Sequence, residues 1–110
     1  MPRKQKYNNK KVTIDGYTFD STNESRWYIV YRDDPTVIDL QVHPRYTLVP
    51  KFTNANGIKR RARSYIADFL VTYEDGRQEI VDVKGFETPL FKLKRDVFEY
   101  TTGKVITIVK

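Results

Sequence analysis

The sequence of 110 residues contains no cysteine and a single histidine. The absence of cysteine excludes disulfide bridges and thiolate zinc sites, and one histidine is too few for most histidine-based metal clusters. No hydrophobic run approaches the ~20 apolar residues that span a bilayer, and no apolar segment follows the basic N-terminal residues as it does in a secretory signal. We therefore expect a cytoplasmic protein with no membrane partner.

Positive charge exceeds negative charge along the chain, with 20 Lys and Arg against 14 Asp and Glu and a formal net charge of +6. This excess favours a polyanionic partner, nucleic acid first, although small basic domains without such a partner exist. The length allows one hydrophobic core, so we expect a single domain over residues 12–110. Residues 1–11 are predicted to form a flexible basic arm, which either lies along phosphates or is a disordered solubilising tail.

The spacing of apolar and turn residues predicts a mixed α/β fold. A helix is expected over 20–34, and a second over 89–102 that begins after Thr88 and ends at Gly103. The apolar stripe predicted for the second helix consists of Leu90, Leu93, Val97 and Phe98. Strands or extended segments are expected over 12–19 (a hairpin), 37–42, 45–52, 66–73, 78–85 and 104–109, with the last packed against the central hairpin.

The central hairpin over 66–85 carries three charged residues among β-branched and aromatic ones, around an Asp-Gly turn. A two-residue loop would put Asp68 on the face opposite to Asp82 and Lys84. A three-residue loop over 75–77 would put Asp68 across from Lys84, with all three charges on one face. The other face would then be wholly apolar, with Phe69, Val71, Val81 and Val83. We expect the three-residue loop for that reason.

Two carboxylates and a lysine on one face suit a hard divalent cation such as Mg²⁺, which takes oxygen ligands. The alternative is a salt bridge in which Lys84 neutralises Asp68 or Asp82, and the hairpin alone does not decide between the two. Carboxylates crowded around one point disfavour ionisation. At least one of them should therefore have a raised pKa without a metal.

Two further positions bear on this site. Glu24 stands three residues after Ser21, which is the spacing of a capping box, so its carboxylate either caps the helix or points at the metal. The lone His43 is expected to be a surface or packed residue rather than a ligand. The basic run 59–63 leads towards Asp68, and it suits the positioning of phosphates beside the site, the alternative being a solvated face.

The order of helix, strands, central hairpin, helix and strand, with Asp68 followed by Asp82-Val83-Lys84, resembles the PD-(D/E)xK nuclease superfamily, with Ala67 in place of the motif's proline. The elements around Glu24, Tyr65–Phe69, Val81–Gly85 and Leu93–Tyr100 are similar to a family of phage-encoded endonucleases described as Holliday-junction-resolvase-like. His43 stands where that family is expected to have Gln.

This resemblance implies a restriction-endonuclease-like core, a central mixed β-sheet with a helix before and a helix after the catalytic hairpin. It implies a Mg²⁺-dependent DNA endonuclease, with Mn²⁺ able to substitute, that acts as a homodimer on branched DNA in the host cell cytoplasm. The implied metal ligands are Asp68, Asp82 and Glu24, and Lys84 completes the catalytic set. The candidates for contacts with the DNA backbone are Arg61, Arg63, Lys92 and Lys94. The alternatives are a non-catalytic DNA-binding module on the same fold and a structural phage protein with a buried ion-pair network.

Overall fold

The computed structural model describes residues 10–110 and has two helices and ten strands in that range. The predicted N-terminal arm, 1–11, lies outside the described residues except for Lys10 and Lys11. The elements in chain order are β1 (Val12–Ile14), β2 (Tyr17–Phe19), α1 (Thr22–Asp33), β3 (Val37–Val42), β4 (Arg45–Val49), β5 (Phe52–Thr53), β6 (Lys59–Arg60), β7 (Arg63–Ile66), β8 (Phe69–Tyr73), β9 (Gln78–Val83), α2 (Pro89–Thr102) and β10 (Ile106–Val109).

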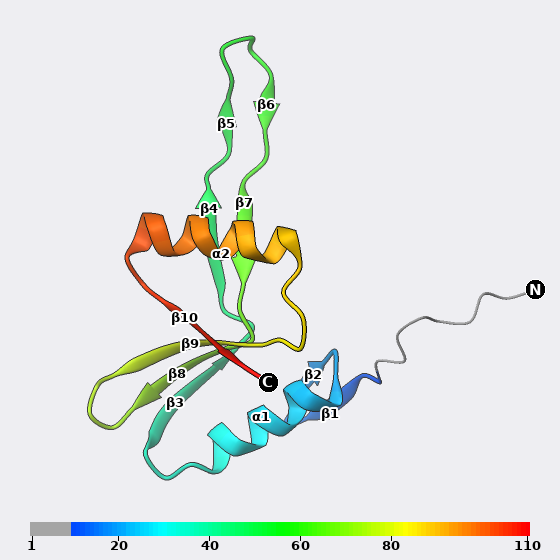
Figure 1. The fold of residues 1–110 in the computed structure, drawn as a ribbon, viewed down its shortest axis with the longest axis vertical. Helices are drawn as coiled ribbons and strands as arrows, with labels where there is room; N and C mark the ends of the chain where they lie inside the picture. The colour runs from blue at the N-terminus through cyan, green and yellow to red at the C-terminus, as the bar shows by residue number, and fades with distance from the viewer. Residues whose placement is uncertain (1–9) are drawn as a thin grey trace, which may run out of the picture.

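The fold is built on a mixed four-stranded sheet with the strand order β10-β9-β8-β3. β10 runs parallel to β9, whereas β8 is antiparallel to both β9 and β3. This arrangement confirms the predicted mixed α/β class and the predicted packing of the last strand against the hairpin. In Figure 1 the helix α1 and the hairpin β1–β2 lie below the sheet, and α2 crosses above it.

Each face of the sheet carries its own hydrophobic core, because neighbouring residues of a strand point to opposite faces. The first core joins α1 and β2 to the sheet and contains Phe19, Tyr28, Tyr31, Phe69, Val71 and Val81. The second joins α2 and the base of β7 to the sheet and contains Tyr65, Ala67, Ile80, Phe91, Phe98 and Ile106. Aromatic residues supply much of both cores, which lets a short chain bury large areas.

The hairpin β8–β9 has the expected odd loop, but its register differs from the prediction. The loop residues are 74–76 rather than 75–77, because Gly76 adopts a φ of 89° and ends the loop. The Tyr73 N–H donates to the Arg77 carbonyl, which closes the loop at 2.8 Å. Leu70 therefore lies opposite Ile80 and not opposite Asp82. Each β8 residue therefore pairs with a β9 residue two positions earlier than predicted. Because side chains alternate between the faces, a shift of two leaves every side chain on its predicted face.

The helix α2 begins and ends where predicted but turns a different side towards the core. Thr88 accepts a hydrogen bond from the Phe91 N–H, and Gly103 ends the helix with a φ of 72°. The predicted stripe is confirmed at Phe98, which is buried together with Phe91, whereas the predicted core residues Leu90 and Leu93 are each 61% exposed. Aromatic residues seven positions apart define this face, and the larger ring area buried explains why it is preferred over the leucine stripe.

Two neighbouring strands bend together at the edge of the sheet. β3 continues through His43 and Pro44 into β4, and β7 continues through Ala67 and Asp68 into β8. The His43 N–H donates to the Asp68 carbonyl at 2.9 Å, and the Ala67 N–H donates to the Pro44 carbonyl at 3.1 Å. Beyond this bend, residues 45–66 form a two-stranded ribbon that projects past α2 (Figure 1), which we call the β arm.

The β arm divides segments that the sequence pattern predicts as continuous. The predicted extended segment 45–52 is split into β4 and β5 around Pro50, which has no N–H to donate to a strand ladder. The basic run 59–63 is likewise shared between β6 and β7. β4 pairs with β7, and β5 pairs with β6, so the arm closes in a turn over 54–57.

Neither helix of the described range 10–110 is long and apolar enough to cross a bilayer.

The different exposure of two α2 residues gives a direct test of which side of this helix faces the core. Phe98 is 1% exposed and Leu93 is 61% exposed. Phe98→Ala should lower the free energy of unfolding by about 3–5 kcal/mol because it leaves a cavity. Leu93→Ala should lower it by less than about 0.5 kcal/mol, as expected of a surface position. Urea denaturation measures both values, and a larger loss for Leu93→Ala would restore the predicted leucine stripe.

Candidate metal centre and basic cleft

Two buried carboxyl groups lie side by side where the bend meets β9. Asp68 is 9% exposed, and its Oδ2 accepts a hydrogen bond of 2.7 Å from the Val83 N–H. Asp82 is 2% exposed and accepts a hydrogen bond from the hydroxyl of Tyr65. The Lys84 Nζ lies 3.9 Å from the Asp82 Oδ1. The predicted set of Asp68, Asp82 and Lys84 is therefore brought together, although not through the predicted cross-strand pairs.

Both carboxyl groups hold a proton more tightly than an exposed carboxyl does. Burial raises the pKa of Asp68 to about 7, and the neighbouring Glu24 carboxyl adds to the rise while the Val83 N–H opposes it. Burial also raises the pKa of Asp82 to about 7, with Asp68 adding to the rise and the Tyr65 hydroxyl and Lys84 opposing it. The expected rise in pKa is confirmed, but burial rather than crowding of like charges is its largest cause.

Glu24 joins this pair from the first turn of α1. Its backbone N–H donates to the Ser21 Oγ at 3.1 Å, which confirms Ser21 as the helix cap. Its Oε2 accepts a long hydrogen bond of 3.4 Å from the Asp20 N–H, one residue before the cap. The capping use of this carboxylate is therefore weak, which leaves its oxygens able to serve another partner.

His43 lies beside Glu24 and Asp68, a neighbourhood that the sequence analysis did not predict for it. Its Nε2 lies 3.8 Å from the Glu24 Oε2, and single ligand atoms of Glu24, His43 and Asp68 all lie within 4.8 Å of one another. His43 has a φ of 55°, in the left-handed region that a non-glycine residue adopts at a cost. The expectation of a surface or packed residue is partly right, since its ring lies 6.0 Å from that of Phe19. The proline that follows His43 signals a bend, but it does not reveal which residues the bend meets.

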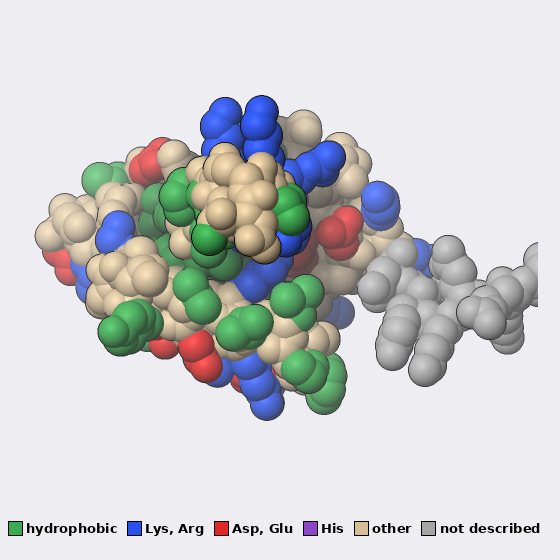
Figure 2. All heavy atoms as spheres, turned by 90° about the horizontal axis from the view of Figure 1, so that it is seen from above, with side chains coloured by type: hydrophobic (Ala, Val, Ile, Leu, Met, Phe, Trp, Pro, Cys, Tyr) green, Lys and Arg blue, Asp and Glu red, His purple; other side chains and the backbone are tan. Residues whose placement is uncertain are grey.

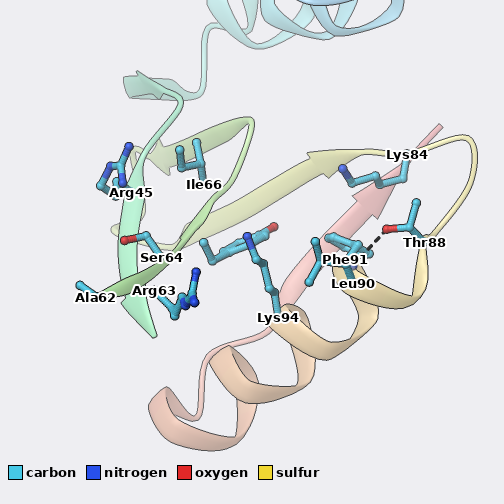
Figure 3. Close-up of a pocket in the computed structure, with 11 residues that line it drawn as sticks. Arg45, Ala62, Arg63, Ser64, Ile66, Lys84, Thr88, Leu90, Phe91 and Lys94 are labelled. Carbon is cyan, nitrogen blue, oxygen red and sulfur yellow. Dashed lines mark hydrogen bonds between the residues drawn. The ribbon is translucent and has the colours of Figure 1, made fainter. Parts of the chain in front are cut away.

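A cleft of about 440 Å³ opens beside the carboxyl pair, between the base of the β arm and the first turns of α2. Four cationic side chains line it, namely Arg45, Arg63, Lys84 and Lys94. Figure 3 shows Arg63, Lys84 and Lys94 directing their nitrogen atoms towards the same space from the arm, from the end of β9 and from α2. The cleft therefore gathers several positive charges in one place.

Lys84 and Tyr65 connect the cleft with the carboxyl pair, because both line the cleft and both contact Asp82. The Lys84 Nζ also lies 4.8 Å from the centre of the Phe91 ring. This cation–π contact holds the Lys84 side chain between the cleft and the carboxyl pair. Burial and the bond to Asp82 raise the pKa of Tyr65, so this hydroxyl stays protonated and donates. Sequence spacing gave no signal for the Tyr65–Asp82 bond, which joins residues on different strands.

The predicted phosphate-binding residues are divided by the structure. Arg63 and Lys94 line the cleft. Arg61 is exposed on the β arm, and Lys92 is exposed on α2, and neither lines the cleft. Arg45 lines the cleft without having been predicted to do so.

The fold and the site define a mixed α/β domain with a buried carboxyl pair beside a basic cleft. The chain belongs to the family described as "Protein of unknown function (DUF1064)", whose model matches residues 4–109. Comparisons with curated proteins and with solved structures returned no match.

The raised pKa values of Asp68 and Asp82 predict that the metal-free protein loses stability as the pH rises. Between the ordinary carboxyl pKa near 4 and the folded value of about 7, the folded state keeps protons that the unfolded chain releases. The free energy of unfolding should therefore fall by up to about 1.4 kcal/mol per pH unit for each group across that window. Urea denaturation in EDTA from pH 5 to 8 measures this slope.

Asp82→Asn provides the matched control for this prediction, because an amide at position 82 keeps the shape and has no proton to lose. The variant should flatten the fall in stability and should be at least as stable as the parent at pH 8. A slope of the opposite sign in the parent would show that the two carboxyl groups are ionised and well paired in the folded state.

Proposed function

We propose that this chain is a metal-dependent endonuclease that hydrolyses phosphodiester bonds in DNA, with branched DNA as its substrate. One observation carries the proposal: Asp68 neighbours both Glu24 and Asp82, and Lys84 stands beside Asp82, so the four side chains gather from α1, the bend and β9 next to a cationic cleft. Buried carboxyl groups with raised pKa values are costly to keep, and they are common where a protein binds a cation or performs chemistry. A basic cleft next to them suits a phosphodiester chain.

The core that we propose is restriction-endonuclease-like. Its support is the mixed sheet with a helix on each face and the acidic residues on adjoining strands. The sequence resemblance to the PD-(D/E)xK superfamily, in which Asp68 and the Asp82-Val83-Lys84 element carry the motif, points the same way. We propose that the enzyme acts in the cytoplasm of the host cell.

The donor set fits a small divalent cation. Glu24 and Asp68, with Asp82 beside Asp68, would supply carboxylate oxygens, which suit Mg²⁺ and Mn²⁺, and His43 would supply a nitrogen, which Mn²⁺ accepts more readily than Mg²⁺. When bound, such a cation polarises a phosphoryl oxygen and lowers the pKa of a water. The Tyr65 hydroxyl and the Val83 N–H hold one oxygen of each aspartate in place, which orients the remaining oxygens.

Lys84 has the position for the remaining chemistry. Its Nζ stands between Asp82 and the cleft, where it would orient the attacking water and stabilise the negative charge that develops on the phosphorus oxygens. Arg45, Arg63 and Lys94 would hold the phosphates on either side of the cleaved bond.

A junction-cutting enzyme needs two active sites to cut two strands, so we propose a homodimer. The exposed side chains of Leu93 on α2 and Val49 on β4, outside the cleft, offer apolar surface for pairing. A non-catalytic DNA-binding module would use the same cleft but would gain nothing from two buried carboxyl groups with raised pKa values.

Lys84→Ala separates catalysis from binding. It should reduce cleavage of a four-way junction in Mg²⁺ by at least 100-fold, because the charge beside the reacting phosphate is lost. Affinity measured in Ca²⁺ should fall only a few-fold, since most phosphate contacts lie elsewhere. Lys104→Ala, an exposed position away from the cleft, is the matched control and should change neither value.

A panel of four-way junctions, flaps, nicked and plain duplexes, incubated with Mg²⁺ and with EDTA, identifies the substrate. Binding without cleavage of any of them under either condition would favour the non-catalytic module. Equal losses of cleavage and affinity in Lys84→Ala would make Lys84 a binding residue only.

Metal binding should also stabilise the folded protein. A cation at one hundred times its dissociation constant adds about 2.7 kcal/mol to the free energy of unfolding. Mg²⁺ and Mn²⁺ should therefore raise the melting temperature at pH 8, and Asp82→Asn should remove most of the rise. His43→Gln should weaken the binding of Mn²⁺ more than that of Mg²⁺. The rises in melting temperature that the two metals cause should therefore become more similar. If both variants show the same metal-induced rise in melting temperature as the parent, the cation binds outside this site.

A further inference from the structure

The β arm carries positive charge that no acidic residue of the arm offsets. Residues 45–66 contain six basic residues and no acidic residue, whereas the remaining 14 basic residues of the chain match its 14 acidic ones. The arm therefore carries a charge equal to the whole net charge of +6. Figure 2, which looks down on the tip of the arm, shows Lys and Arg side chains along one side of it.

The tip of the arm is well formed although it lies outside both cores. The Asn54 Oδ1 accepts hydrogen bonds of 2.9 Å from the N–H groups of Asn56 and Ile58, and Gly57 turns the chain with a φ of 79°. Phe52 and Ile58 near the tip are 49% and 47% exposed. An ordered turn thus exposes cationic and apolar side chains to solvent.

The charge of the arm is continuous with that of the cleft. Arg45 and Arg63 line the cleft and stand at the base of the arm, and Lys51, Lys59 and Arg60 follow towards the tip. The ten residues from Arg45 to Asn54 span about 30 Å at the rise of a β-strand. This length is close to one turn of B-form DNA, about 34 Å or ten base pairs.

We infer that the β arm lies in the major groove of a DNA duplex that extends from the cleft, and holds about one turn of it. The major groove admits a two-stranded ribbon, the cations would contact the phosphates on either side, and Phe52 and Ile58 would contact sugars and thymine methyl groups. This inference rests on the proposed function, since it takes the cleft as the place where the cleaved strand binds.

A length series of duplexes joined to one junction measures the reach of the arm. Affinity of the parent protein should increase as the duplex is lengthened to about ten base pairs and then level off. The double variant Lys59→Gln with Arg60→Gln should bind a long duplex about tenfold more weakly and show a salt slope lower by about two. The control double variant Lys104→Gln with Lys110→Gln, of equal charge change, should stay within twofold of the parent.

A small substrate distinguishes this inference from the proposed function. Hydrolysis of bis(p-nitrophenyl) phosphate with Mn²⁺ needs no flanking DNA, so it should be the same in the arm variant and the parent. If the diester is hydrolysed but affinity does not depend on duplex length or on the arm charges, the arm inference is overturned and the function stands. If neither the diester nor DNA is hydrolysed while the length dependence is present, the arm inference stands and the endonuclease proposal fails. An equal loss of affinity for single-stranded DNA of the same length would overturn the placement in a duplex groove.

Discussion

The bend shared by two adjacent strands is the constraint on which the rest of this structure depends. The backbone bonds from His43 to Asp68 and from Ala67 to Pro44 hold both strands together where they change direction. Before the bend the strands belong to the four-stranded sheet, and beyond it they form the arm. The same bend places Asp68 against the Val83 N–H and brings His43 towards Glu24. A single change of backbone direction therefore positions Asp68 and His43 in the candidate site and directs the β arm away from it.

The two buried aspartates give the site its electrostatic character. Removing a carboxylate from water is costly unless charge or hydrogen bonds compensate. Asp82 has a neutral hydroxyl and a lysine 3.9 Å away, and Asp68 has one backbone N–H, so the compensation is incomplete and the pKa of each is raised. The remaining need for positive charge is what a divalent cation would meet. This incomplete compensation lowers the stability of the folded chain, as is common at sites that bind ligands.

Local signals in the sequence predicted the elements well. The Asp-Gly turns, Ser21 and Thr88 as helix caps, and Gly103 as a helix end each act through neighbouring backbone groups, so short stretches suffice to find them. The convergence of Asp68, Asp82 and Lys84 also followed from alternation along strands. The loop register was misplaced by one residue because the position of the left-handed Gly76 within the loop is not encoded by its identity.

The features that could not be predicted depend on contacts between distant segments. α2 has two apolar sides, and the side with Leu90 and Leu93 is exposed. Which side packs on the sheet depends on the shape of the sheet face. His43 reaches the site only because of a backbone conformation that histidine seldom adopts. The bond from Tyr65 to Asp82 depends on how the arm base lies across β9.

The way the arm tip is closed has a consequence for how such a protein can change over time. Its turn is held by bonds among residues 54–58, and β5 pairs with β6. Insertions, deletions or exchanges at the tip therefore leave the four-stranded sheet, the aspartates and the cleft in place. Selection can alter what the tip touches without disturbing the buried groups. The sequence of the tip can thus vary independently of the buried carboxyl groups.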